Sequence, residues 1–272
     1  MNNFHTHTYR CKHASGDVID YADQASQAGM EILGMSDHCP FPDGRWPHVR
    51  MDLPMLPDYE RAVYRAREKY PDLTIIKGLE CEWVPSMRAY IEDTFLADNR
   101  FQYLIGAVHW IPYLDEWLEL REITPFMLRS YSDLLIEAME TGLYLFIAHP
   151  DIFGMGYYQW DEDAKACSKD ILEAAEELDI PLEINGYGMR KPNIITPYGE
   201  ERDKYPWIPF WEMASDYDIR VVCNSDAHKP EDVADSIDRC LDIAHRFELE
   251  VEDFSDTLFP PDQAPVQEIS RK

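Results

Sequence analysis

The chain has 272 residues, which fits one large domain or two small ones, and 45% of the residues are apolar, enough to bury a sizeable core. Its net charge of −27 argues against nucleic acid or an anionic membrane as the main partner. An anionic substrate would need a local positive centre, because the overall field of the protein repels it.

The sequence predicts a cytoplasmic protein. No stretch approaches the roughly 20 consecutive apolar residues of a membrane helix, and the N-terminal residues lack the basic and apolar runs of a signal peptide. The six cysteines, at positions 11, 39, 81, 167, 223 and 240, form no Cys-x-x-Cys pair. We therefore expect reduced thiols.

Short apolar runs alternate with longer amphipathic stretches along the chain. Helices are predicted at 16–29, from about 57 to 67, at 87–97, 126–140 and 163–178, and in a last helix opened by Lys229-Pro230-Glu231-Asp232. Seven apolar runs, starting at about residues 3, 31, 74, 103, 144, 181 and 220, are predicted strands. This alternation predicts βα units, a parallel sheet and a barrel-like α/β domain over residues 1–253. We expect residues 254–272 to form an extended surface tail.

Polar side chains follow six of the predicted strands. His5 and His7 are two residues apart on a strand, so they share a face. A lone His-x-His near a chain end is more often a pair of surface residues. Here, however, later strands also end in metal-competent residues: Asp37 and His38, Glu80, His109, His149, and Asp226 with His228. Since active sites of such barrels lie at the C-terminal ends of the strands, we predict one site there.

These donors favour a multinuclear metal site. Imidazole and carboxylate together suit zinc, iron or manganese. With His13 the set has nine members, enough for two or three ions: His5, His7, His13, His38, Glu80, His109, His149, Asp226 and His228. A carboxylate that bridges two ions is typical of hydrolytic sites, where bound water ionises near neutral pH. Asp37 is a candidate for orienting a ligand histidine.

The order of these motifs resembles the PHP (polymerase and histidinol phosphatase) superfamily over nearly the whole chain. The motif His5-Thr6-His7-Thr8 followed by Cys11-x-His13, then Asp37-His38-x-Pro40 and Gly106-Ala107-Val108-His109, is most similar to its histidinol-phosphatase branch. The resemblance implies a distorted (β/α)7 TIM-like barrel with three divalent metal ions. It also implies hydrolysis of a small phosphorylated metabolite, L-histidinol phosphate first of all, by in-line attack of a metal-bridging hydroxide.

The resemblance also implies how the nine residues divide among three ions. One ion would be held by His5, His7, Glu80 and Asp226, and Glu80 would bridge to a second ion held by His109 and His149. The third would be held by His13, His38 and His228. The resemblance thus gives catalytic roles to Glu80 and Asp226, and Asp37 is a third candidate.

Three basic residues are candidates for binding the substrate. Arg190 and Lys191, just after the sixth predicted strand, match a basic segment of the family, and Arg50 is a weaker candidate. Each arginine could equally form a surface salt bridge. The chain departs from the family at residues 151–160, which are aromatic and uncharged apart from Asp151. The departure leaves open another small phosphomonoester as substrate.

Two rival readings are a PHP nuclease or phosphodiesterase, which the acidic charge disfavours, and a non-catalytic metal-binding protein, which the complete donor set disfavours. The stretch 110–122 is longer than a tight loop and is a candidate cover for the site.

Overall fold

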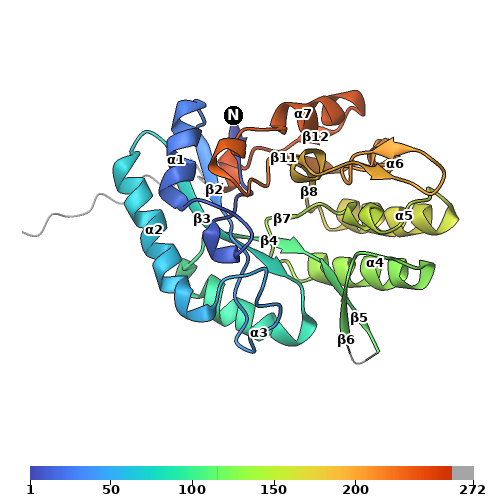
Figure 1. The fold of residues 1–272 in the computed structure, drawn as a ribbon, viewed down its shortest axis with the longest axis horizontal. Coiled ribbons are helices and arrows are strands. Elements are labelled where there is room, and N and C mark those ends of the chain that lie inside the picture. Colours follow the sequence, from blue (N-terminus) through green and yellow to red (C-terminus); the bar gives the residue numbers. More distant parts are fainter. Residues whose placement is uncertain (115, 259–272) are drawn as a thin grey trace, which may run out of the picture.

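The centre of the molecule is a curled sheet of eight parallel strands with helices packed around its outside (Figure 1). The computed structural model describes residues 1–114 and 116–258. In spatial order, the strands of this sheet are β1 (Asn2–Asn3), β2 (Ile32–Met35), β3 (Thr74–Glu82), β4 (Tyr103–Ala107), β7 (Phe146–Ile147), β8 (Leu182–Asn185), β11 (Arg220–Asn224) and β12 (Glu250–Val251).

All seven predicted strands are present, and the parallel α/β architecture is confirmed. The sheet has one strand more than predicted, because β12 pairs with the start of β11 at Arg220 and Val221. Beyond the other end of β11, Ala227 forms a parallel bridge with Thr6, just after β1. This bridge brings the first strand back to the seventh, so the sheet curls into a barrel-like shape.

Side chains alternate between the inside and the outside of this curl. On β3, Ile76 packs in the interior, whereas Ile75 and Leu79 pack outward beneath the helices. The interior cluster consists of Phe4, Ile32, Ile76, Tyr103, Ile105, Ala107, Phe146, Ala148, Val222 and Phe254. Because a strand has a period of two, the inward positions that follow Ile76 on β3 are Gly78, Glu80 and Glu82. The interior is therefore apolar at one end and acidic at the other.

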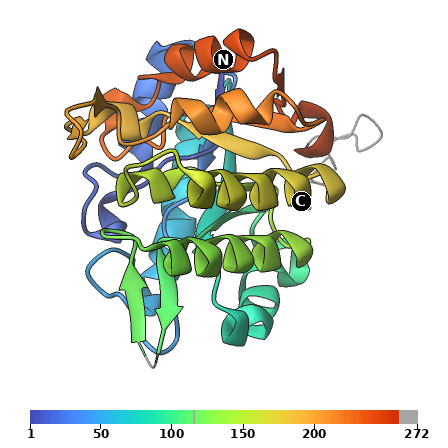
Figure 2. The ribbon, with the colours of Figure 1, turned by 90° about the vertical axis from the view of Figure 1, so that its right-hand side faces the viewer.

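The helices are α1 (Val18–Gln27), α2 (Leu56–Lys69), α3 (Arg88–Ile91), α4 (Pro125–Glu140), α5 (Glu162–Glu177), α6 (Ile208–Ala214), α7 (Ile237–Arg246) and α8 (Ser255–Leu258). Figure 2 shows α4, α5 and α6 side by side on one flank. Among the described residues, no helix has both the length and the apolar character to cross a membrane.

Local sequence explains several helix starts. Asp17 caps α1 in a capping box with Asp20, and Thr124 caps α4 ahead of Pro125. Asp161 accepts hydrogen bonds from the backbone N–H groups of Asp163 and Ala164 at the start of α5. These caps satisfy N–H groups that have no partner within the helix, so each helix begins close to its predicted position.

Single-turn and irregular elements fill several loops. They are the 3-10 turns η1 (Tyr9–Cys11), η2 (Leu53–Met55), η3 (Pro85–Met87), η5 (Ala97–Asn99), η6 (Ile152–Met155), η7 (Tyr187–Arg190) and η8 (Pro230–Asp232), and the π-helical turn η4 (Glu92–Leu96). Two antiparallel hairpins pair β5 (Trp110–Tyr113) with β6 (Glu116–Glu119), and β9 (Ile194–Ile195) with β10 (Glu201–Arg202).

Three predictions differ from the structure. The last helix begins at Ile237 and not at Pro230. Ser236 has a positive φ of 65°, which breaks the helical conformation between η8 and α7. The sequence reading missed α6, a helix of only 7 residues. Phe254, expected to start an extended surface tail, is 2% exposed and belongs to the interior cluster, and the next four residues form the short helix α8. The rest of the predicted tail, residues 259–272, lies outside the described residues.

Candidate metal centre

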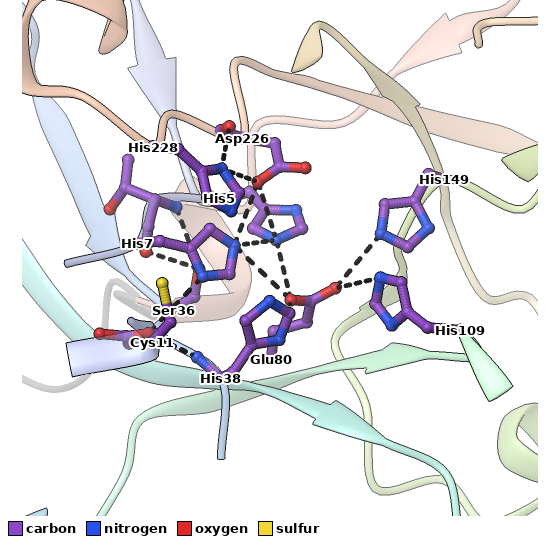
Figure 3. A network of polar contacts seen from close by, with 12 residues as sticks. His5, His7, Cys11, Ser36, His38, Glu80, His109, His149, Asp226 and His228 are labelled. Atoms are coloured by element: carbon purple, nitrogen blue, oxygen red, sulfur yellow. Dashed lines mark hydrogen bonds and ion pairs between the residues drawn. The ribbon is translucent and has the colours of Figure 1, made fainter. Parts of the chain in front are cut away.

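Backbone pairing brings the predicted donors together at the C-terminal ends of the strands. The bridge between Thr6 and Ala227 sets the pair His5 and His7 beside the pair Asp226 and His228. A second parallel bridge joins His38 to Glu80. Donors more than 200 residues apart in sequence therefore meet because their strands are neighbours, as Figure 3 shows.

Four side-chain atoms form a compact cage. The His7 Nε2 atom lies 3.1 Å from His5 Nε2, 3.1 Å from Asp226 Oδ1 and 3.5 Å from Glu80 Oε2. The His5 Nε2 atom lies 3.6 Å from the same two carboxylate oxygens. A tetrahedral zinc site with bonds of about 2.1 Å has donor atoms about 3.4 Å apart. The observed spacings match that geometry.

The two carboxylate oxygens of this cage have imidazole nitrogens as their near neighbours, including His38 Nδ1 at 2.8 Å from Glu80 Oε2 and His228 Nδ1 at 3.4 Å from Asp226 Oδ1. Within the described residues, neither Glu80 Oε2 nor Asp226 Oδ1 accepts a hydrogen bond, although both are buried. Buried polar atoms are rarely left without partners, so unpaired oxygens beside imidazole nitrogens are the pattern expected where a cation binds. The residues present therefore fit a divalent metal ion.

The electrostatics of the cage agree with this fit. Burial opposes the charged form of Glu80, but His38 and His5 hold its pKa well below the usual range. Burial likewise opposes the charge of Asp226, whose pKa is held well below its usual range by His5 and His228. Burial would lower the pKa of His5, but Asp226, Glu183 and Glu80 raise it to about 10. The site thus holds ionised carboxylates that attract positive charge.

The second oxygen of Glu80 faces a different pair of histidines. Glu80 Oε1 lies 3.2 Å from His149 Nε2 and 3.7 Å from His109 Nε2. Figure 3 shows the carboxylate between this pair and the cage formed with His5 and His7. One carboxylate therefore faces two donor groups, one with each oxygen.

The three histidines predicted to hold a third ion lie close together, with the His13 ring centre 5.4 Å from that of His38 and 4.7 Å from that of His228. His13 Nε2 and His228 Nε2 are 3.0 Å apart, whereas His38 Nδ1 lies 2.8 Å from Glu80 Oε2. His7, His38 and His228 also have ligand atoms within 4.8 Å of one another. Burial lowers the pKa of both His38 and His228 well below its usual value, which favours the neutral imidazole that metal binding requires.

The rings are held by partners on the side away from the cage. Four histidines use Nδ1 for this purpose: His5 with Glu183 Oε1 at 2.8 Å, His109 with Glu82 Oε2 at 2.8 Å, His13 with the Cys11 carbonyl at 2.9 Å, and His228 with the Asp226 carbonyl at 3.1 Å. Such partners fix the orientation and tautomer of a metal-binding histidine and raise its basicity.

Sequence reasoning missed Glu82 and Glu183. Glu183 is fully buried and also accepts hydrogen bonds from the His149 backbone N–H and from the amides of Asn185 and Asn224. A signal was present, because an acid stands between Leu182 and Ile184 in an otherwise apolar strand. Glu82 follows Glu80 by two residues and therefore shares its face.

Asp37 is buried behind the metal donors. Its carboxylate accepts hydrogen bonds from the Thr8 hydroxyl and from the backbone N–H groups of Thr8 and His38, and it lies 3.7 Å from His7 Nδ1. It is not among the described residues that line the cavity over the donors. These contacts favour a positioning role for Asp37 over the predicted catalytic one.

A cavity of about 200 Å³ lies over the donors. One side is formed by six of the predicted donor histidines, all except His5, together with Glu80 and Asp226. The other side is formed mostly by apolar and aromatic side chains: Val49, Trp110, Leu120, Ile152, Met155, Tyr187 and Tyr205. Lys191 and Glu119 are the charged residues of this second side among the described residues.

The hairpin β5–β6 contributes to this wall, because Trp110 and Glu119 line the cavity and Leu120 follows directly. The stretch 110–122 is therefore a hairpin beside the cavity. The uncharged segment 151–160 contributes Ile152 and Met155. Asp151 is buried, and its carboxylate accepts hydrogen bonds from the Trp207 backbone N–H and from Trp211 Nε1.

Lys191 alone of the three predicted substrate-binding residues lines the cavity. Within the described residues its Nζ atom has no hydrogen bond or ion pair, and it lies 3.9 Å from the centre of the Tyr187 ring. Burial lowers the pKa of Lys191 from its usual value. An ammonium group without a carboxylate partner is available to an anionic ligand.

The two arginines are engaged elsewhere. The Nη atoms of Arg190 donate to the carbonyls of Asp235, Ser225 and Asp226. Arg50 is 1% exposed; it donates to the Cys39 carbonyl, and its guanidinium carbon lies 5.1 Å from the centre of the Trp46 ring. Direct contact of either arginine with a substrate stays a prediction, and the observed contacts favour positioning roles.

Comparison with known proteins identifies the family of this chain. The profile of the PHP domain family matches residues 3–186. The chain belongs to the PHP family. A protein of Deinococcus radiodurans named "Probable histidinol-phosphatase" is 29% identical over 263 residues, which cover 89% of this PHP chain and 93% of that protein. A "Probable phosphatase" of Acetivibrio thermocellus is 25% identical over 227 residues, covering 82% and 78%.

A solved structure of a phosphatase shares the fold. The histidinol phosphate phosphatase of Lactococcus lactis, complexed with zinc, L-histidinol and phosphate, superposes with a TM-score of 0.71 over 92% of this chain and 94% of that one. Its sequence identity is 16%, so the likeness shows a common fold. The predicted membership of the PHP superfamily is confirmed.

Proposed function

We propose that this PHP protein hydrolyses a small phosphomonoester to an alcohol and phosphate, with L-histidinol phosphate as the first candidate substrate. The observation that carries the proposal is Glu80, whose two oxygens face two separate groups of donors. Bridged divalent ions are characteristic of enzymes that catalyse displacement at phosphorus.

The metal assignment is part of the proposal. We propose one site at His5, His7, Glu80 and Asp226, and a second at Glu80, His109 and His149. His13, His38 and His228 would serve a third ion, with His38 close enough to Glu80 to be shared with the first. Bound zinc, iron or manganese would neutralise charge on the phosphoryl oxygens and make water a stronger acid.

The remaining cavity residues have roles that do not depend on the number of ions. The unpaired ammonium of Lys191 would bind a phosphate oxygen, which concentrates an anionic substrate inside a strongly acidic protein. The carboxylates of Glu82 and Glu183 would keep the imidazoles of His109 and His5 turned toward the centre.

The wall of the cavity favours an apolar leaving group. Trp110, Leu120, Ile152 and Met155 offer little hydrogen bonding to the hydroxyls of a sugar, whereas they can pack against a ring. Glu119 provides one negative charge on the same side. An alcohol with an aromatic ring and an amino group, such as L-histidinol, matches this wall. The relative from Deinococcus radiodurans and the Lactococcus lactis structure support the same choice.

The proposal is tested by metal analysis of the purified protein together with turnover of L-histidinol phosphate, simple sugar phosphates and a nucleotide diester. We expect bound metal, phosphate release from L-histidinol phosphate, loss of activity after chelation and its return when metal is restored. Protein in the same buffers without chelator is the control.

The outcomes separate the alternatives. Failure to bind metal would overturn the whole scheme. Bound metal with activity only on other monoesters would remove the histidinol assignment, and activity only on the diester would favour a phosphodiesterase. Bound metal without turnover of any substrate would leave a metal-binding protein.

A further inference from the structure

One short segment after β8 contacts several parts of the site. The Asn185 side-chain amide donates to Asp226 Oδ2 at 3.1 Å, and the Asn185 Oδ1 atom accepts from the Tyr187 backbone N–H at 2.8 Å. The segment then forms the 3-10 turn η7 and ends at Lys191. These seven residues therefore connect Asp226, a candidate metal donor that Asn185 contacts, with Lys191, the cation that lines the cavity.

The aromatic ring of Tyr187 is the centre of this segment. It lies parallel to the His228 imidazole, with ring centres 4.1 Å apart and planes 8° apart. The Lys191 ammonium nitrogen lies 3.9 Å from the centre of the same ring. The Tyr187 ring thus touches both His228, a histidine of the donor set, and the Lys191 ammonium that lines the cavity.

We propose that Tyr187 is a positioning residue that holds the Lys191 ammonium over the cavity, where it binds the phosphate group, while its ring packs against His228. The substrate class rests on the function proposed above. The contact between Tyr187 and Lys191 can be tested without turnover, because inorganic phosphate is itself a ligand for the cation.

The chemistry of the contact explains why a ring is needed. Within the described residues the Lys191 ammonium forms no ion pair with a carboxylate, and the Tyr187 ring, 3.9 Å away, is nearer to it than the Tyr205 ring at 6.0 Å, so the face of Tyr187 provides the main attraction that holds it. A carboxylate at this place would hold the lysine more firmly but would neutralise it. An aromatic face restrains the ammonium group and leaves its three N–H donors available to a phosphate.

The same geometry attributes the positioning of Lys191 to the ring of Tyr187 and not to its hydroxyl group. No hydrogen bond of the Tyr187 hydroxyl is found within the described residues, whereas the ring makes both contacts. Tyr187→Phe should therefore behave like the natural protein. Tyr187→Leu keeps a branched apolar side chain but removes the aromatic face.

The experiment measures inorganic phosphate binding by calorimetry to the zinc-loaded protein, with zinc content determined for each variant. The variants are Tyr187→Phe, Tyr187→Leu, Lys191→Met and the double variant with Leu at 187 and Met at 191. We expect Tyr187→Phe to bind phosphate within about twofold of the natural protein, and Tyr187→Leu to bind about 3- to 10-fold more weakly at equal zinc content. The KM for the phosphomonoester should rise by the same factor, with a smaller change in kcat.

The double variant gives the decisive comparison. If Tyr187 acts through Lys191, the double variant binds phosphate no more weakly than Lys191→Met alone. Additive losses in the double variant, or equal losses in Tyr187→Phe and Tyr187→Leu, would overturn the proposal, as would weaker binding explained by lost zinc. A natural protein that binds phosphate but hydrolyses no monoester would contradict the proposed function and still allow this comparison.

Discussion

The two ends of the sheet interior are built from the same strands but have opposite chemistry. At the N-terminal end, Phe254 packs edge-on against Phe4 and parallel to Phe146, with ring centres 5.3 and 5.8 Å apart. At the C-terminal end, the same interior holds Glu80 and Glu183 among histidines. Position along an inward-facing row of residues therefore decides whether a side chain stabilises the fold or serves the site.

The comparison shows how the free-energy cost of burying charged groups is offset. The carboxylates at the C-terminal end are buried but face histidines, amides and backbone N–H groups. Burying these groups without partners would be strongly unfavourable. The apolar end supplies the stabilisation that offsets this cost, because buried aromatic and aliphatic side chains contribute about 1.5–3 kcal/mol each.

The largest expected effect follows from changing the shared carboxylate at the polar end. Glu80→Gln should lower phosphomonoesterase activity by about 1,000-fold or more, because the amide carries no charge and offers one oxygen in place of two. Phosphate release and metal content are the measurements. Glu137→Gln, an exposed acid on α4, is the control. A fully active Glu80→Gln protein would contradict the bridging role.

The apolar end is tested by Phe254→Ala. Removing this ring should lower the free energy of unfolding by about 3–5 kcal/mol, because it leaves a cavity between Phe4 and Phe146. Denaturant unfolding measures the loss, and Phe126→Ala, whose side chain is 68% exposed, is the control. Metal content of the folded fraction should not change. An unchanged unfolding midpoint would show that Phe254 does not close the interior.

Glu183→Gln tests the partners behind the donors. The substitution replaces one oxygen by an amide N–H₂ group, which faces donors in either orientation: the His149 N–H and the Asn185 amide at the Oε2 position, or the Asn224 amide at the Oε1 position. We expect metal affinity to fall by about 10- to 100-fold, the effect typical of such partners. Metal competition with a chelating dye measures it. Equal affinity in the variant would mean that His5 needs no charged partner.

The smallest expected effect concerns the Tyr144 hydroxyl, a buried polar group that has no role in the proposed metal site. The Tyr144 hydroxyl is buried and has no hydrogen-bond partner within the described residues, and its ring packs edge-on against Trp83 with ring centres 6.3 Å apart. Tyr144→Phe removes this group, so we expect the protein to keep its stability or gain up to about 1 kcal/mol. Thermal unfolding in matched buffer measures the change. A loss of more than that would reveal a partner for the hydroxyl.

The sequence alone determined the strand and helix alternation and the donor types. Apolar runs of about five residues, six of them ending in histidine or an acid, predicted both the parallel sheet and the polar edge. Residue types such as His5, His7 and Glu80 carry that information locally. The family followed from their order along the chain.

Tertiary structure decided what depends on neighbours distant in sequence. The cage needs the bridge between Thr6 and Ala227, which no local pattern encodes. Likewise, Glu183 looks like one acid in a strand until the curl of the sheet brings it within 2.8 Å of His5. Local sequence determines the alternation of inward and outward side chains along a strand and the residue types at its end. Register across the sheet decides which of these side chains meet.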